Sequence, residues 1–177
     1  MFRILIIIAP ERFRDEELFV TQTELEKAGH ETVIASLKPG LCSGSRGDFA
    51  TATLSIAEAN PAQFDAVVFV GGGGSRRYFA DENALRIARE MNAQGKVVAA
   101  ICLAPVILAN AGLLDGKNAT VAGTEARTIA SQGAHYTGPG VTVDGNIITG
   151  NAPKSSQLFG QKINSALAAR QEISNHH

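Results

Sequence analysis

The segment KVVAAICLAPVILANAG, residues 96–112, contains in immediate succession a strand-like run, a cysteine and a helix-like run. Residues 96–101 are mostly aliphatic, as in a buried strand, and residues 104–111 have the composition of an apolar helix. Cys102 therefore falls at a sharp strand-to-helix turn. Such a turn is similar to a nucleophile elbow, which lifts one side chain above the edge of a sheet and beside free helix N–H groups.

Cys102 is the candidate reactive residue of the chain. Backbone N–H groups and the dipole of the following helix are expected to favour the anionic thiolate, which is the nucleophilic and oxidisable form of cysteine. The alternative is a buried structural cysteine, because free cysteine is among the most buried residue types.

The alternation of apolar runs with amphipathic stretches extends over most of the chain. Strands are predicted at residues 2–8, 31–36, 66–70, 96–101 and 119–122, and helices at 15–28, 83–94, 104–111, 125–132 and about 155–169. Continuous aliphatic runs without polar alternation indicate strands that are covered on both faces. The expected fold is therefore α/β, with a mainly parallel sheet and helices on each side.

Two further segments have β signals: the first predicts an insertion or a hairpin, and the second predicts a β-hairpin. The turn at 44–47 is followed by the β-rich run 50–56, and Asp144-Gly145-Asn146 separates two β-rich runs within 141–149. Neither repeats nor linkers divide the chain, so we expect one domain over residues 1–172 and a tail at 173–177. His176 and His177, which are either native or the remnant of a tag, take no part in the functional reasoning.

Composition limits the partners and the compartment. The chain has 177 residues, of which 45% are hydrophobic and 19% charged, and its net charge of −1 offers no basic field for nucleic acid or anionic lipid. The apolar run at 4–8 is too short to span a membrane. Cys42 and Cys102 are expected to be free thiols in a cytoplasmic protein, with a bridge between them as the alternative.

Three predicted strands end in chemically unusual loops, which are expected to meet at one edge of a parallel sheet. An acidic loop, a run of glycines and Cys102 follow the first, third and fourth predicted strands. Their members are Glu11, Asp15, Glu16 and Glu17 in the first loop and Gly71, Gly72, Gly73 and Gly74 in the second. A carboxylate, bare backbone N–H groups and a thiol are thus predicted to converge.

The glycine run has three interpretations. It lacks the Gly-Lys-Ser/Thr ending of a phosphate-binding loop, and Arg76 stands where a dinucleotide fingerprint has its third glycine. Alternatively, glycines allow the backbone to approach the thiol closely and to direct N–H groups at an oxyanion. The third interpretation is a flexible turn.

Other candidate residues are weaker. Arg76 and Arg77 are candidates to anchor a ligand carboxylate, although paired loop arginines are more often solvated or at a subunit contact. His135 is a candidate base, although a lone histidine is more often a surface or packing residue. The histidines and cysteines show no metal-ligand spacing, so no metal is predicted.

Several motifs of this chain resemble the ThiJ/PfpI superfamily, in particular the branch of the Parkinson-disease protein deglycase and its bacterial relatives. The resemblance covers nearly the whole chain. The motifs are FRDEEL at 13–18, EKAGHE at 26–31, GSRG at 44–47, DAVVFVGG at 65–72, VAAICLAP at 98–105, VDGNIIT at 143–149 and FG at 159–160.

The resemblance implies a flavodoxin-like three-layer sandwich, a homodimer and an elbow cysteine, Cys102, contacted by the carboxylate of Glu17. It assigns the oxyanion-binding amides to Gly72 or Gly73 and to Leu103. It also implies a glyoxalase or deglycase activity on small, reactive α-oxoaldehydes without a cofactor. The alternative is a non-enzymatic redox sensor or stress-response protein whose cysteine oxidises to sulfinate.

The chain also departs from the family pattern. Peptidase-like members carry histidine directly after the cysteine and glutamate in the loop after Gly-Gly, whereas this chain has Leu103 and Arg76. Because a cysteine hydrolase needs a base near its thiol, an amidase or peptidase activity is only a minor alternative. Glyoxalase-type members often add a histidine at the position of Gly123-Thr124-Glu125, and here Glu125 or His135 is the candidate substitute.

Overall fold

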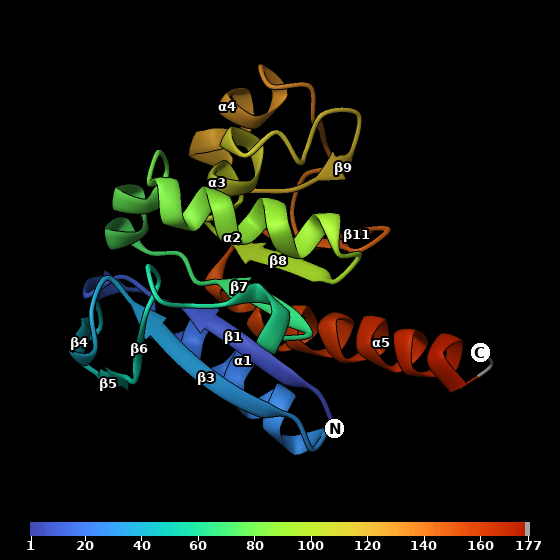
Figure 1. The fold of residues 1–177 in the computed structure, drawn as a ribbon. Helices are drawn as coiled ribbons and strands as arrows, with labels where there is room; N and C mark the ends of the chain where they lie inside the picture. Colours follow the sequence, from blue (N-terminus) through green and yellow to red (C-terminus); the bar gives the residue numbers. More distant parts are fainter. Residues whose placement is uncertain (176–177) are drawn as a thin grey trace.

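Seven strands form the central sheet of the computed structural model, which describes residues 1–175 (Figure 1). They are β1 (Arg3–Ile7), β3 (Glu31–Ser36), β6 (Leu54–Ser55), β7 (Ala66–Phe69), β8 (Val97–Ile101), β11 (Val141–Asp144) and β12 (Ile147–Gly150). The sheet order is β11-β12-β8-β7-β1-β3-β6, and every neighbouring pair is parallel except β11 and β12. His176 and His177 lie outside the described residues.

Helices cover both faces of this sheet. They are α1 (Asp15–Lys27), α2 (Glu82–Ala93), α3 (Pro105–Asn110), α4 (Ala126–Ala130) and α5 (Ser156–Asn175). α1 and α5 lie together on one face, and α2 and α3 cover the other, with α4 against α3 (Figure 1). The flavodoxin-like three-layer sandwich predicted from the sequence is therefore confirmed.

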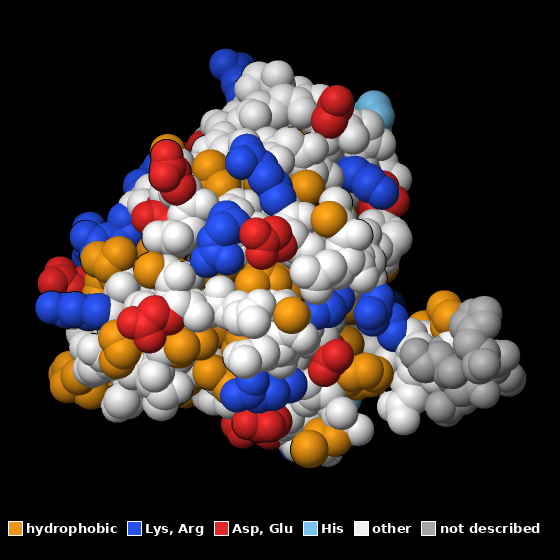
Figure 2. Space-filling view, in the orientation of Figure 1, with side chains coloured by type: hydrophobic (Ala, Val, Ile, Leu, Met, Phe, Trp, Pro, Cys, Tyr) orange, Lys and Arg blue, Asp and Glu red, His pale blue; other side chains and the backbone are white. Residues whose placement is uncertain are grey.

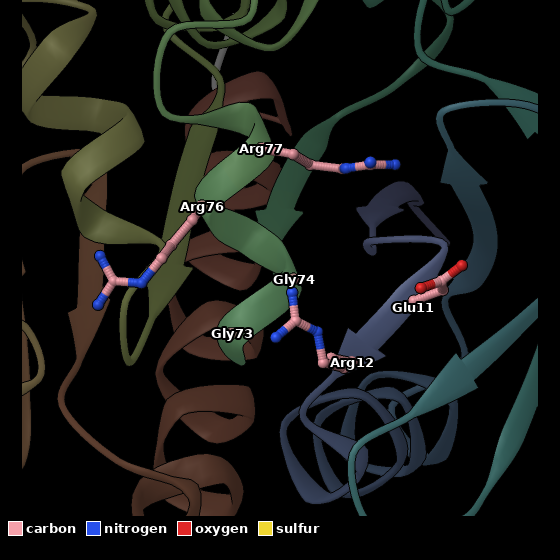
Figure 3. Close-up of a pocket in the computed structure, with 6 residues that line it drawn as sticks. All are labelled: Glu11, Arg12, Gly73, Gly74, Arg76 and Arg77. Carbon is pink, nitrogen blue, oxygen red and sulfur yellow. The ribbon is translucent and has the colours of Figure 1, made fainter.

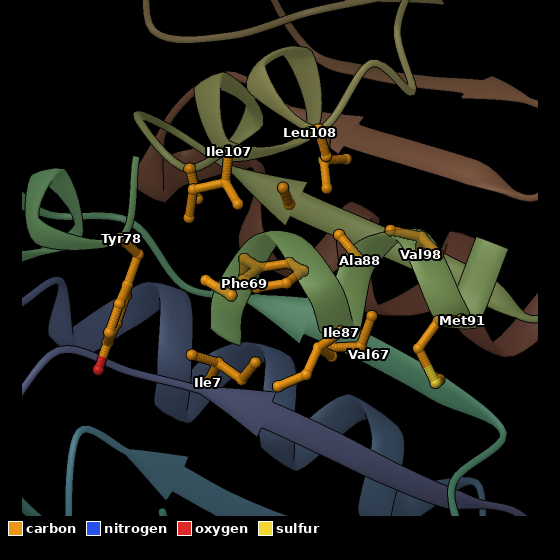
Figure 4. Packing of buried hydrophobic residues seen from close by; sticks show 14 of the residues in the cluster. Ile7, Val67, Phe69, Tyr78, Ile87, Ala88, Met91, Val98, Ile107 and Leu108 are labelled. Atoms are coloured by element: carbon orange, nitrogen blue, oxygen red, sulfur yellow. The ribbon is translucent and has the colours of Figure 1, made fainter. Parts of the chain in front are cut away.

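The strands are apolar throughout because each face of the sheet packs against helices. On the α2 and α3 face, Phe69 and Val98 from the sheet pack with Ile87, Met91 and Ile107 from the helices (Figure 4). Each of these side chains is at most 1% exposed. Burying a side chain of this size contributes roughly 1.5–3 kcal/mol, so the two apolar layers hold the sheet edge in place for the loops that follow it.

The strand order creates a crevice at the loop edge of the sheet. The chain leaves β1 toward β3 on one side, and later strands β7, β8 and β12 are added on the other side. In such a sheet, ligands bind beyond the carboxyl ends of the strands where this reversal occurs, here between β1 and β7. The acidic loop, the glycine run and Cys102 follow β1, β7 and β8, so they share this edge as predicted.

The first predicted hairpin is confirmed as β4 (Gly40–Gly44) and β5 (Phe49–Ala52). It belongs to a small sheet of order β2-β4-β5, in which β2 (Glu11–Phe13) comes from the acidic loop. The sequence did not predict β2, because a strand of three residues is too short to show a periodic pattern. β2 fixes the acidic loop against the hairpin.

The prediction of a core strand at 119–122 is wrong. Only β9 (Asn118–Ala119) forms, and it pairs with β10 (His135–Tyr136) outside the central sheet. The following residues do not continue the strand. The Thr120 N–H donates to the Thr149 hydroxyl, and the Ala122 N–H donates to the Cys102 carbonyl. Ala119 and Val121 are buried, which explains why this segment is apolar although it forms no strand of the central sheet.

The C-terminal elements follow the predicted pattern with one difference. β11 and β12 form the predicted antiparallel hairpin. α5 continues to Asn175, beyond the expected end near residue 169 and into the segment expected to be a tail. None of the helices within residues 1–175 has the length and apolar composition needed to cross a membrane. On the face seen in Figure 2, basic and acidic side chains are interspersed.

Candidate active site

Cys102 occupies a tight turn directly after β8. Its φ of 66° lies in the left-handed region, which residues with a Cβ rarely adopt. The backbone is held from both sides, because its N–H donates to Gly150 O at 2.9 Å and its carbonyl accepts from Ala122 N at 2.7 Å. Strained residues of this kind concentrate at functional sites. The predicted elbow geometry is present, and the side chain is half-buried rather than sealed in the core.

Glu17 is the carboxylate that the fold brings to this thiol. It lies in the first turn of α1 and is fully buried, and its Oε1 accepts a hydrogen bond from Gly71 N at 2.9 Å. Its side chain lies close enough to the Cys102 thiol for each group to shift the pKa of the other. Its second oxygen, Oε2, is buried without a well-formed hydrogen bond to any residue in 1–175. One oxygen is thus anchored by backbone, and the other is buried without a partner among residues 1–175.

The other acids of the first loop have different partners. Asp15 accepts hydrogen bonds from the N–H groups of Arg46 and Asp48 at 2.8 and 2.9 Å, so it holds the β4–β5 turn. Glu16 forms an ion pair with Arg14 at 2.9 Å. Glu11 is exposed on β2. The chain therefore offers the thiol one carboxylate.

Backbone amides complete the surroundings of the sulfur. The backbone amides of Gly72 and Leu103 lie close enough to the sulfur to lower the pKa of the Cys102 thiol. Of the two glycines considered from the sequence, the structure brings Gly72 to the sulfur. Gly73 instead begins the short 3₁₀ helix η2 (Gly73–Tyr78) and lines a neighbouring cavity.

The glycine run is a close-packed turn, as the second interpretation of the sequence proposes. A Cβ on Gly71 would stand 2.6 Å from Glu17 Oε1 and 2.8 Å from the Cys102 Cβ. Gly72 has a φ of 99°, and a Cβ there would meet the Arg12 carbonyl at 2.6 Å. Glycine is therefore required where the turn contacts the carboxyl, the cysteine and the first loop.

Burial dominates the electrostatics of the pair. It raises the pKa of the Glu17 carboxyl to about 7, against the opposing hydrogen bonds from Cys102 and Gly71. Burial, followed by the neighbouring Glu17 charge, raises the pKa of the Cys102 thiol to about 12, while the amides of Gly72 and Leu103 lower it. The amides act in the direction expected from the sequence, but burial and the neighbouring carboxylate outweigh them in the pKa of the Cys102 thiol.

The two titrations are coupled, because the charge on one group opposes ionisation of the other. When Glu17 holds a proton, its charge disappears and the two amides still favour the thiolate. With pKa values of about 7 and about 12, the pair gives up its first proton near neutral pH and keeps the second well above it. The carboxyl is a proton carrier rather than a permanent anion.

The two auxiliary candidates lie in different places. Glu125 is at the rim of the site, where its Oε1 pairs with Arg76 at 3.3 Å and its Oε2 accepts from Thr128 Oγ1 at 2.7 Å. His135 is exposed on β10, beside Asn118. Asn118 donates to Asp144, and the β11–β12 hairpin links Asp144 through Ile147 to Val98, at the start of β8.

His135 therefore lies at the opposite end of β8 from Cys102, in keeping with the alternative interpretation of a surface residue. The other histidine among residues 1–175, His30, accepts from Phe2 N at the start of β1, also away from the loop edge. Within the same residues, no group of three or more His, Cys, Asp or Glu side chains is arranged to hold a metal ion. Cys42 and Cys102 are both free thiols.

The sequence reasoning missed Arg12. It is the second non-glycine residue with positive φ, at 58°, and its carbonyl packs on Gly72. A positive φ at an arginine has no signature in the sequence, and the neighbouring carboxylates carry the more obvious chemical signal of this loop.

Comparisons with known proteins agree on one family. A model described as the DJ-1/PfpI family matches residues 2–166. Over 173 residues the chain is 40% identical to an uncharacterized protein of Methanocaldococcus jannaschii, covering 96% of this chain and 84% of that protein. Over 149 residues it is 35% identical to Deglycase PfpI of Pyrococcus furiosus, covering 84% and 90%. The solved ThiJ/PfpI domain protein of Brachyspira murdochii aligns with a TM-score of 0.92 at 32% identity, covering 94% of this chain and 96% of that one.

Gly71→Ala is expected to destabilise the protein by about 1–3 kcal/mol, because its Cβ overlaps Glu17 Oε1, the Ile101 carbonyl and Cys102. Gly73→Ala is the matched control, since its Cβ has ordinary contact only with Arg12 Nη1 at 3.9 Å. Urea unfolding measures both. Equal stability of the two variants would contradict the close packing described for Gly71.

Glu17→Gln tests the raised carboxyl pKa. Above the unfolded value near 4.5, the folded wild type binds more protons than the unfolded chain, so its stability falls as pH rises toward about 7. That pKa difference corresponds to a loss on the order of 3 kcal/mol. The Gln variant cannot ionise, so the free energy of unfolding between pH 4 and 8 should depend less on pH than in the wild type. Parallel pH profiles for the two proteins would refute the raised pKa.

Proposed function

The chain belongs to the DJ-1/PfpI family, and on this basis we propose that it is a cofactor-independent enzyme of the glyoxalase or deglycase type, acting on small α-oxoaldehydes. Relatives that bear the name deglycase support a hydrolase or lyase type of activity. The observation that carries the proposal is the buried Glu17 carboxyl, which Gly71 N anchors through Oε1 and which interacts with the Cys102 thiol.

The first step is addition of sulfur to the substrate. Glu17 accepts the thiol proton as Cys102 attacks the aldehyde carbon. It then passes that proton to the new alkoxide, which gives the thiohemiacetal and leaves Glu17 ionised for the next step. The amides of Gly72 and Leu103 stabilise the negative charge that develops on the former aldehyde oxygen. This arrangement needs no second base, because the carboxyl has a pKa near the operating pH.

The following steps move a proton between two carbons. Glu17 removes the proton from the former aldehyde carbon to give an enediol and returns a proton to the neighbouring carbon, which leaves a thioester of an α-hydroxy acid. Water hydrolyses the thioester and restores the Cys102 thiol. The net reaction adds one water to the α-oxoaldehyde and yields the α-hydroxy acid, so atoms and electrons balance without a cofactor.

The amidase or peptidase alternative has no equivalent support. Leu103 follows the cysteine, and both histidines in residues 1–175 lie at the other end of the sheet. Without an imidazole beside the thiol, the leaving amine has only Glu17 as a proton donor. The carbonyl reaction, which expels no amine, suits this site better.

A redox role is the second candidate, favoured by the accessibility of the two thiols. Cys102 is half-buried, whereas Cys42 is only 2% exposed. Two equivalents of peroxide convert a thiol to a sulfinate with release of two waters. A protonated Glu17 can donate a short hydrogen bond to that sulfinate, and the amides of Gly72 and Leu103 can donate to its oxygens.

We expect the wild type to convert methylglyoxal to lactate, measured by enzymatic detection of the product. Cys102→Ser and Glu17→Gln should each lower kcat/KM by at least about 100-fold, because one removes the nucleophile and the other the proton carrier. Cys42→Ala is the matched control and should retain activity. Turnover that survives loss of Cys102 would exclude the proposed chemistry.

Mild peroxide should add two oxygen atoms to Cys102, as measured by intact and peptide mass spectrometry. Glu17→Gln should reduce the sulfinate yield, because the amide lacks the acidic proton. Oxidation of Cys42 before Cys102 would rule out the redox role.

A further inference from the structure

A small cavity lies beside the glycine run, on the side of the first loop (Figure 3). Its volume is about 280 Å³, and its lining residues are Glu11, Arg12, Gly73, Gly74, Arg76 and Arg77. Cys102 is not among them. The cavity nevertheless begins at Gly73, one residue beyond the amide of Gly72 that faces the sulfur. Its size suits a compound of a few carbon atoms rather than a nucleotide.

The charge of this cavity is unbalanced. Three arginines and one glutamate are among its lining residues. Arg76 projects to the other side of η2 from Arg12 and pairs with Glu125 (Figure 3). Arg12 and Arg77 form no ion pair within 4.0 Å with any acid in the described part of the chain. Arg12 thus lies beside Gly73 and Gly74, and Arg77 projects from the other end of η2 on the side of Glu11 (Figure 3).

The backbone that carries Arg12 is fixed in place. The pairing of β2 with β4 holds its flanks, with Ser43 N donating to Pro10 O at 3.0 Å and Ser45 N donating to Phe13 O at 2.9 Å. Gly74 packs so closely under the Glu11 carbonyl that a Cβ there would overlap it at 1.9 Å. The positive φ of Arg12 is therefore maintained by packing, which is typical of residues that hold a side chain toward a ligand.

We propose that Arg12 and Arg77 form a binding site for a small oxyanion group, either a carboxylate or a phosphate. Guanidinium groups bind both through charge-assisted hydrogen bonds. In combination with the proposed function, on which this step rests, the site selects α-oxoaldehydes that carry such a group at the end away from the aldehyde. The anion is held by the arginines while the aldehyde reaches the amides beside Cys102.

Binding is tested first, because it does not depend on turnover. Inorganic phosphate is titrated into the protein in phosphate-free buffer at low ionic strength, with calorimetry as the readout. Arg77→Gln and Arg12→Asn should each weaken phosphate binding by about tenfold, and asparagine is chosen at position 12 because it tolerates a positive φ. Arg127→Gln, which removes an exposed arginine of α4, is the matched control and should bind as the wild type does.

Substrate selection is tested with three α-oxoaldehydes: neutral methylglyoxal, γ,δ-dioxovalerate with a carboxylate, and the phosphate ester of hydroxypyruvaldehyde. The readout is the ratio of kcat/KM for each anionic compound to that for methylglyoxal. Arg77→Gln and Arg12→Asn should lower this ratio by about tenfold, mainly through KM, whereas Arg127→Gln should not change it. The two anionic compounds distinguish a carboxylate site from a phosphate site.

The outcomes separate the two proposals. If both arginine variants bind phosphate as the wild type does and keep its substrate ratios, the oxyanion site is overturned, even when methylglyoxal is turned over. Suppose instead that the wild type turns over none of the aldehydes but binds phosphate, and that the arginine variants bind phosphate more weakly. The proposed enzyme activity then fails, and the oxyanion site stands. Thermal melting of each variant confirms that it is folded.

Discussion

The contact between the Glu17 carboxyl and the Gly71 N–H is the interaction on which the site depends. A buried carboxyl needs a hydrogen-bond donor, and here the donor is backbone that lies against both the acid and Cys102. The contact is possible because α1 starts directly after the β1 loop, while the glycine turn and the elbow follow neighbouring strands β7 and β8. The parallel sheet thus determines which side chains meet.

The same carboxyl connects the two candidate functions. A proton that is held near neutral pH serves as an acid and base during carbonyl chemistry, and as a donor to an oxidised sulfur. The high thiol pKa in the presence of ionised Glu17 keeps the sulfur protonated until that proton moves to the carboxyl. In the proposed chemistry, the protonation of Cys102 thus depends on burial and on the charge of Glu17 more than on the amides of the turn.

Patterns local to the sequence predicted most of the layered fold. The strands at 31–36 and 96–101 and the two hairpins were recognised because aliphatic runs and turn residues carry short-range signals. Glu17 was selected through the family resemblance, and the structure brings it to the thiol. The features that the sequence did not predict depend on distant partners: the loss of the strand at 119–122 follows from Thr149 and Cys102, and the remoteness of His135 from its pairing with Asn118. The raised thiol pKa depends on burial, which no motif encodes.

The clamp on the Cys102 backbone has an evolutionary consequence. Its two hydrogen bonds, to Gly150 and from Ala122, involve only main-chain atoms, so the bend does not rely on sulfur for its shape. A related protein can therefore carry another residue in place of Cys102 after a single codon change and keep both main-chain hydrogen bonds of the turn. Chemistry and foldability are separable at this position, which makes it a place where related proteins can diverge in activity while their backbones stay superimposable.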